Sequence, residues 1–214
     1  MAPTPDNLRS IRKYRRAASG YDSTTGPTWP IRIHCIDLLK LDKGDTVLDV
    51  GCGTGLSFEP LLERIGRQGL LVAFEQSPEM HARAEQRAQV LKAQGWRIEL
   101  QCASAEEVRL PSRPDAALFH YVHDISRTPA AIENLFAQLA PGTRLAIAGM
   151  KFFPWWLAPL NLLAWLKNRP YNVRARELVK PWSLIAARLD DFRWKPTQGG
   201  MGYIGSGRVR GSGS

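Results

Sequence analysis

The sequence predicts an α/β fold in which helices cover both faces of a mostly parallel sheet. The first observation behind this prediction is an apolar run, Val47–Val50, that enters a loop with glycine at every second position of residues 51–55. The second is that apolar residues recur at helical spacing over residues 56–65, before another apolar run at 70–74. A strand, a tight turn, a helix and a second strand form a βαβ unit of the Rossmann-like kind, whose strands are parallel.

The glycine loop is predicted to hold a ligand. Gly51, Gly53 and Gly55 can adopt positive φ and let the backbone approach a ligand closely. Glu75 ends the second strand, where an acid binds ribose hydroxyls in units of this type. A nicotinamide-binding loop would carry its third glycine at position 56, which is leucine here, so the pattern disfavours a dinucleotide. A tight strand–helix turn without a ligand is the alternative.

Composition sets the broad class of protein. The 214 residues suffice for one α/β domain with a sizeable core, and the three cysteines show neither metal-like spacing nor a disulfide framework, which favours a cytoplasmic setting. The first residues do not read as a secretory signal, and no run of about 20 apolar residues predicts a membrane-spanning helix. The net charge of +9 favours anionic partners such as phosphate, lipid headgroups or nucleic acid.

Helices are expected before and after the first two strands in the sequence. Residues 8–18 combine five basic residues with apolar ones at helical spacing, which predicts a short basic amphipathic helix that packs on the domain or acts as a lid or membrane-surface contact. A helix opens at Trp29-Pro30 and runs to about Leu39. After Glu75, Ser77 is a suitable helix cap and Pro78 a suitable first helical residue, for a helix ending near Gln94.

The second half of the chain continues the alternation of strands and helices. Strands are predicted at 98–102, from 115 into a loop that ends at 124, and at 145–149, with a helix over 128–139 between the last two. A helical segment over about 176–189, interrupted by Pro181-Trp182, precedes two alternating runs at 191–195 and 201–205. These two runs are predicted to form an antiparallel hairpin that closes the sheet.

Residues 152–166 are rich in tryptophan, phenylalanine and leucine and are flanked by basic residues. The segment is too short and too interrupted by proline to span a bilayer. Two interpretations stay open: a buried cap over the active site, or an interfacial segment in contact with lipid. Both favour an apolar substrate.

The string Asp49-Val50-Gly51-Cys52-Gly53-Thr54-Gly55, together with Glu75, resembles the class I S-adenosylmethionine-dependent methyltransferases. Three further stretches resemble the ubiquinone/menaquinone-biosynthesis branch: Tyr21-Asp22, the run Ser77–Met80, and Ala103–Glu106, where relatives show an aspartate in place of Ser104. The resemblance implies a seven-stranded Rossmann-like sheet with a C-terminal antiparallel hairpin. It also implies a lid at 1–20, a methyltransferase domain at 21–207 with an aromatic cap insertion at 150–190, and a tail at 208–214.

The same resemblance implies S-adenosyl-L-methionine as the cofactor. The glycine loop would admit the methionine portion, Glu75 the ribose, and Ser104 and Ala105 the adenine, while Asp49 would fix the loop or reach the methionine ammonium. The full set of expected cofactor-binding residues is Tyr21, Asp49, Gly51, Cys52, Gly53, Gly55, Glu75, Gln76, Met80, Ser104, Ala105 and His120.

Candidate catalytic residues follow the fourth predicted strand, because ligands in open α/β sheets bind beyond the carboxyl ends of the strands. Histidine is suited to accept a proton from a phenol or a carbon acid near neutral pH. His123 is expected to be the base or to orient the substrate, with His120 or Tyr121 as alternatives; a helix cap or a purely structural role is the competing interpretation. No metal site is expected, because no further Cys or His cluster supports one.

The predicted function is methyl transfer to an apolar small molecule or a lipid-type acceptor. A peripheral contact with the inner face of a membrane accompanies the lipid version. An RNA or DNA methyltransferase is the alternative enzyme, but the chain shows no N/D-P-P-Y motif and no appended RNA-binding module, so nucleic acid is disfavoured. A non-catalytic cofactor-binding protein is the alternative from another class. The sequence predicts neither the acceptor atom nor the oligomeric state.

Overall fold

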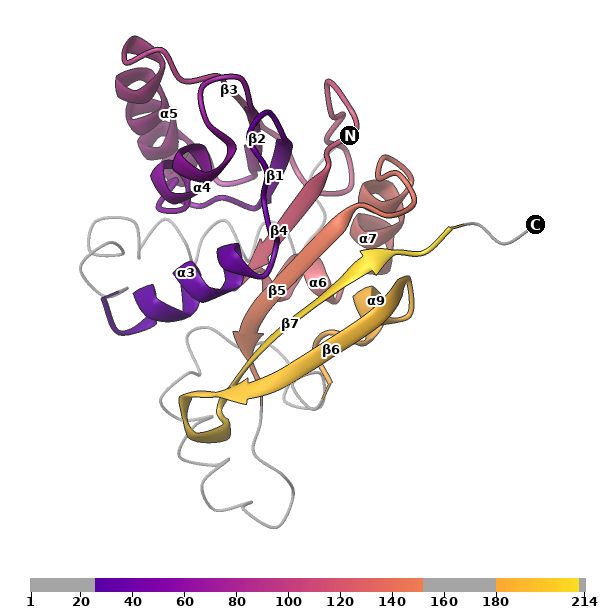
Figure 1. The fold of residues 1–214 in the computed structure, drawn as a ribbon. Coiled ribbons are helices and arrows are strands. Elements are labelled where there is room, and N and C mark those ends of the chain that lie inside the picture. The colour runs from indigo at the N-terminus through magenta and orange to yellow at the C-terminus, as the bar shows by residue number, and fades with distance from the viewer. Residues whose placement is uncertain (1–25, 152–179, 212–214) are drawn as a thin grey trace.

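The computed structural model describes residues 26–151 and 180–211 (Figure 1). The basic helix expected at 8–18, Tyr21 and the aromatic segment 152–166 lie outside these ranges. Among the described residues, none of the helices combines the length and apolar character needed to cross a membrane.

One seven-stranded sheet forms the centre of the molecule, with the strand order β3-β2-β1-β4-β5-β7-β6. The first five strands pair in parallel, whereas β7 runs antiparallel to both β5 and β6. The predicted sheet with its closing hairpin is therefore confirmed. The strands are β1 (Thr46–Val50), β2 (Leu70–Glu75), β3 (Ile98–Cys102), β4 (Ala116–His120), β5 (Arg144–Met150), β6 (Leu189–Thr197) and β7 (Gly202–Val209).

Helices cover both faces of this sheet (Figure 1). On one face lie α3 (Trp29–Asp37), α4 (Phe58–Ile65) and α5 (Pro78–Ala93), and on the other α7 (Pro129–Phe136) and α9 (Ser183–Ala186). The strands alternate their side chains between two apolar cores: Val47 and Leu71 pack toward α4 and α5, and their neighbours Leu48 and Val72 pack toward α7. Three short elements complete the described chain: η1 (Gly26–Thr28), α6 (His123–Ser126) and η4 (Gln198–Gly200).

The start of α5 follows the predicted capping chemistry. Ser77 has extended backbone angles, and its hydroxyl accepts the backbone N–H of Met80 at 3.4 Å. Pro78 occupies the first helical position, where its missing N–H leaves no intrahelical bond unmade. This cap sets the direction of the chain as it leaves the carboxyl end of β2.

The glycine loop after β1 needs glycine for two different reasons. A Cβ added at Gly51, where φ is +59°, would lie 2.9 Å from Val122 and from Ile125, in the segment that follows β4. A Cβ at Gly55, where φ is +79°, would lie 2.7 Å from the ring of Phe58 in α4. Gly51 therefore allows the β4 segment to approach the loop, and Gly55 allows Phe58 to pack under it.

The observed boundaries differ from the expected ones at several places, of which four bear on the loops and the closing hairpin. Helix α4 begins at Phe58 and not at Leu56, because the chain first makes a turn in which Phe58 N–H donates to Gly55 C=O at 3.0 Å. A short helix, α6, replaces part of the loop expected after β4. Of the helix expected over 176–189, the described part forms only α9, and Leu189 already begins β6. Strand β7 continues through Arg208 and Val209, which were expected in the tail.

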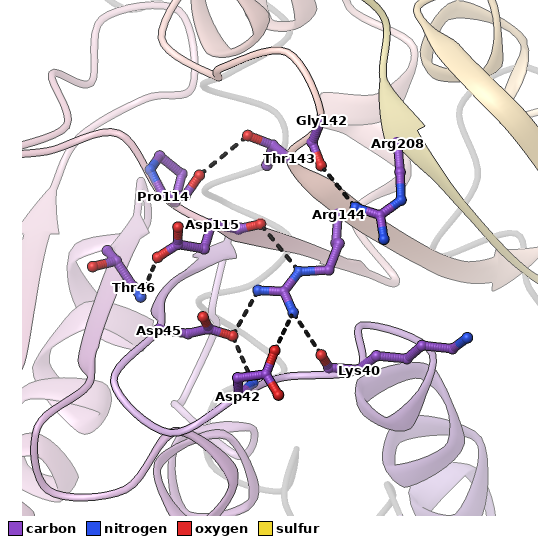
Figure 2. A network of polar contacts seen from close by, with 10 residues as sticks. All are labelled: Lys40, Asp42, Asp45, Thr46, Pro114, Asp115, Gly142, Thr143, Arg144 and Arg208. Atoms are coloured by element: carbon purple, nitrogen blue, oxygen red, sulfur yellow. Dashed lines mark hydrogen bonds and ion pairs between the residues drawn. The ribbon is translucent and has the colours of Figure 1, made fainter.

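A polar network ties together the amino ends of β1, β4 and β5 (Figure 2). The glycine loop lies at the other end of the sheet, where the strands have their carboxyl ends. Arg144, at the start of β5, donates to Asp45 Oδ2 at 2.6 Å and to Lys40 C=O at 2.6 Å. Asp115 Oδ2 accepts the backbone N–H of Thr46 at 2.8 Å. The turn before β1 is thus held against β4 and β5 at one edge, while the opposite edge carries the loops that form a pocket.

Candidate active site

A pocket lies beyond the carboxyl ends of β1, β2 and β4, where open α/β sheets bind ligands. Its empty volume, counted out to the open mouth, is about 740 Å³. The glycine loop after β1, the end of β2, α3 and the segment after β4 all contribute to its wall.

Glu75 joins the end of β2 to the glycine loop. Its side chain is 7% exposed; Oε2 accepts the backbone N–H of Gly53 at 3.0 Å and Oε1 that of Ser77 at 2.8 Å. Burial raises the pKa of Glu75, and the backbone N–H groups of Ser77, Gly53 and Gln76 oppose that increase. The carboxylate is therefore held in place by backbone donors while it forms part of the pocket wall.

Asp49 is a buried carboxylate whose bonding is incomplete. It is 2% exposed on β1, lines the pocket, and its Oδ2 has no hydrogen-bond partner among the described residues. Burial raises the pKa of Asp49 to about 7, the charge of Glu75 adds to the increase, and the guanidinium of Arg32 opposes it. A buried carboxylate of this kind is stabilised by a cationic group in the pocket.

Arg32 is a pocket residue that the sequence prediction missed. It lies on α3, is 7% exposed, and its Nη1 donates to Ser57 Oγ at 2.5 Å. The signal that could have found it is its spacing from Cys35 and Ile36, because residues three and four apart share one helix face and both of these are buried. An arginine on the buried face of a helix requires a polar environment, and here the pocket supplies it.

His120 ends β4 and is 8% exposed in the pocket wall. Neither ring nitrogen has a hydrogen-bond partner among the described residues. Burial holds the pKa of His120 well below its ordinary value, and the nearby Arg32 and His123 act in the same direction. The imidazole is therefore neutral near pH 7, and a neutral imidazole has one donor and one acceptor nitrogen.

Tyr121 follows His120 with a backbone φ of +59°, which is uncommon for a bulky residue. Its N–H donates to Ala148 C=O at 2.8 Å, and its ring lies 4.8 Å from that of His120, centroid to centroid. Such backbone strain costs on the order of 1–3 kcal/mol and concentrates at functional sites. The bend directs the chain after β4 across the mouth of the glycine loop.

His123 occupies a different position. Its Nε2 accepts the backbone N–H of Met150 at 3.0 Å, which fixes the end of β5, and the residue does not line the pocket. The proton-accepting electron pair of that nitrogen is therefore engaged in this structure. Of the two histidines named from the sequence, His120 is the one that faces the ligand space.

A protein-family model described as "Methyltransferase domain" matches residues 47–142, which run from β1 to the turn just before β5 and include the glycine loop and the segment after β4. The protein is an S-adenosylmethionine-dependent methyltransferase. The cofactor of this methyltransferase is S-adenosyl-L-methionine.

Three curated relatives show how far the sequence similarity extends. A 2-phytyl-1,4-naphtoquinone methyltransferase of Thermosynechococcus vestitus is 29% identical over 52% of this chain and 49% of its own length. A protein-L-isoaspartate O-methyltransferase of Archaeoglobus fulgidus is 26% identical over 86% of this chain and 73% of its own. An aklanonic acid methyltransferase of a Streptomyces species is 28% identical over 81% of each. The methyltransferase thus spans about half of the first relative and most of the other two.

The fold is also that of solved methyltransferases. The N-methyltransferase NodS of Bradyrhizobium japonicum, solved in complex with S-adenosyl-L-homocysteine, superposes with a TM-score of 0.65 over 94% of this chain and 98% of the other. The sequence identity is 16%, so this comparison concerns the fold alone.

The residues present fit the cofactor. The glycine loop faces open space at Gly53, where an added Cβ would meet nothing within 4 Å. Asp49 offers an ammonium a buried carboxylate oxygen that has no partner among the described residues, and Glu75 stands at the end of β2. Most of the expected cofactor and catalytic residues line the pocket: Asp49, Gly51, Cys52, Gly53, Glu75, Gln76, Met80, Ala105, His120 and Tyr121.

Three of the expected residues that the structure describes lie outside the pocket lining. Gly55 lies beneath the loop against Phe58, and Ser104 donates its hydroxyl to Glu107 at 3.4 Å. Neither these two nor His123 lines the pocket, and Tyr21 lies outside the described residues. Besides Arg32, the structure adds lining residues that were not named as cofactor or catalytic residues: Thr54, Leu56, Phe74, Val122, Asp124 and Ile125.

Proposed function

We propose that this methyltransferase transfers a methyl group to an apolar small molecule or a lipid-type acceptor. The observation that carries the proposal is that one pocket joins the buried carboxylates Asp49 and Glu75 to apolar side chains after β4 and to a neutral His120, whose ring has no hydrogen-bond partner in the described part of the chain. The polar groups suit the methyl donor, S-adenosylmethionine, and the apolar wall suits the molecule that accepts the methyl group.

On the donor side, Glu75 binds the ribose hydroxyls and Asp49 receives the methionine ammonium. The loop at Gly51–Gly53 admits the methionine chain, and Met80 and Ala105 contact the adenine. The support is burial: Asp49 and Glu75 are less than a tenth exposed, and a hydrogen bond to a buried charged group contributes more than one to a neutral group.

On the acceptor side, Val122, Ile125, Leu56 and the ring of Tyr121 provide an apolar surface at the pocket. When bound, the cofactor supplies an electrophilic methyl group on a cationic sulfur. The chain's own residues then have to align the acceptor atom with that methyl group and exclude water. His120 accepts the hydrogen bond of an acceptor O–H or N–H and takes its proton, because the neutral imidazole has an available electron pair.

Two relatives support a small organic acceptor, since their names specify a phytyl naphthoquinone and aklanonic acid. Another relative is named for isoaspartate in proteins, which is a polar carboxylate acceptor. The apolar surface formed by Val122, Ile125 and Leu56 favours the first class.

The test is a labelling experiment. The full-length protein is incubated with methyl-tritiated S-adenosylmethionine and, separately, with reduced naphthoquinones, substituted phenols, a phospholipid extract, an isoaspartyl peptide and total RNA. Label is expected in an organic-soluble product of the first three mixtures and is expected to be lost with His120→Ala. Label confined to the peptide or the RNA, or no label despite tight binding of S-adenosylhomocysteine, would overturn the proposed acceptor class.

A further inference from the structure

Arg32 has no role in the function proposed so far, yet it is buried in the same pocket. The amino-acid end of S-adenosylmethionine carries both an ammonium and a carboxylate. Among the described residues that line the pocket, Asp49, Glu75 and Asp124 are acids and Arg32 is the single arginine or lysine. A pocket with acids alone would suit the ammonium and repel the carboxylate.

The position of Arg32 links it to Asp49 on one side and to the glycine-loop helix on the other. Its charge acts on both Asp49 and His120, as the pKa values of these two residues show. Its Nη1 donates at 2.5 Å to the hydroxyl of Ser57, a buried residue that directly precedes α4. Ser57 therefore fixes the guanidinium at the point where the glycine loop turns into the helix.

We propose that Arg32 binds the carboxylate of the cofactor's amino-acid end while Asp49 receives its ammonium, so that this buried pair of opposite charges selects ligands that keep the whole amino acid. The proposal rests on the proposed function for the identity of the donor and goes beyond it in assigning a specificity residue. A planar guanidinium suits a carboxylate because its N–H groups match the two oxygens.

A purely structural role for Arg32 is the competing explanation, since the Ser57 contact connects α3 to α4. Arg64 offers a matched control, because it also connects α4 to α3: its Nη2 lies 2.6 Å from Asp37 Oδ1. Arg64 does not line the pocket. A structural role would make the two arginines alike in ligand binding, whereas carboxylate recognition sets Arg32 apart.

The experiment measures by calorimetry the affinity of three ligands for the wild-type protein, Arg32→Gln and Arg64→Gln. S-adenosylhomocysteine has both charged groups, S-adenosyl-3-thiopropylamine lacks only the carboxylate, and 5′-methylthioadenosine lacks both. Arg32→Gln is expected to weaken S-adenosylhomocysteine about tenfold or more and to change the other two by no more than about twofold. Arg64→Gln is expected to leave all three affinities unchanged.

Equal weakening of all three ligands by Arg32→Gln, or no weakening, would overturn the proposal. If that variant does not fold, the test uses the affinities of the wild-type protein for two ligands. Binding of S-adenosyl-3-thiopropylamine as tightly as S-adenosylhomocysteine would be incompatible with carboxylate recognition. Failure of the wild type to bind S-adenosylhomocysteine would overturn both the donor assignment and this proposal. A protein that shows the expected ligand preference but labels no acceptor would contradict only the proposed acceptor class.

Discussion

The carboxylate of Glu75 accepts the backbone N–H of Gly53 at 3.0 Å, so the end of β2 holds the glycine loop that follows β1. Its other oxygen accepts the N–H of Ser77 at the start of α5. A single buried side chain therefore sets the relative position of the loop and the two strand ends at which we propose that the methyl donor binds.

Replacing Glu75 by alanine is expected to weaken S-adenosylhomocysteine more than tenfold, because charge-assisted hydrogen bonds contribute about 1.5–3 kcal/mol. Calorimetric titration measures the effect. Glu85→Ala serves as the control, since Glu85 lies on α5 and does not line the pocket. Unchanged affinity in Glu75→Ala would refute the assignment of Glu75 to the donor.

The affinity for S-adenosylhomocysteine is expected to rise with pH up to about pH 7 and then to level off. The folded protein holds Asp49 at a pKa of about 7, above the ordinary value of 3.8, so the carboxylate is largely protonated below neutral pH. An ammonium requires the ionised form, and its binding therefore releases a proton. Arg32 favours ionisation and Glu75 opposes it, while burial holds the pKa of the neighbouring His120 well below its ordinary value.

The raised pKa of Asp49 is expected to affect stability in the opposite direction to cofactor affinity. The ionised carboxylate is disfavoured in the fold, so its contribution lowers the free energy of unfolding as pH rises from about 4 to about 7. Calorimetry of the wild-type protein and of Asp49→Asn between about pH 4 and pH 7 separates the contribution of Asp49 from that of the other titrating groups. The variant is expected to lose the pH dependence of binding; if it keeps the full dependence, another group titrates.

Replacing His120 is expected to impair catalysis, whereas replacing His123 is expected to lower stability. His120→Ala should lower kcat by about 10²-fold, the lower end of general acid–base effects, and leave the affinity for S-adenosylhomocysteine nearly unchanged. His123→Ala should instead lower the free energy of unfolding by about 1–3 kcal/mol, because the Met150 N–H loses its acceptor. Steady-state kinetics and urea unfolding measure the two quantities, and the reverse pattern would assign catalysis to His123.

Arg144 is expected to contribute to the free energy of unfolding and not to cofactor affinity. Arg144→Leu leaves Asp45, which is 13% exposed, without its 2.6 Å partner, and this should lower the free energy of unfolding by about 1.5–3 kcal/mol. The affinity for S-adenosylhomocysteine should remain unchanged, because the network lies at the opposite edge of the sheet (Figure 2). Arg208→Leu, which removes one longer bond to Gly142 C=O, is the control. A loss of cofactor affinity in Arg144→Leu would show that the two edges are coupled.

The local sequence was sufficient to predict the sheet, the glycine loop, Glu75 and the cap of α5. Each of these features follows from interactions within one element or its immediate turn: apolar periodicity, the conformational freedom of Gly51, and the capping hydroxyl of Ser77. Such signals are recorded in residues a few positions apart, so the chain alone determined the class of fold and the position of the glycine loop that lines the pocket.

The tertiary structure alone decided which residues share the pocket. It brought Arg32 of α3 beside Asp49 of β1, and it engaged His123 Nε2 with the Met150 N–H, 27 residues away, while leaving His120 neutral against the ligand space. Spacing along the chain does not encode these relationships, because burial and the charges of distant segments set the protonation state and partners of a side chain.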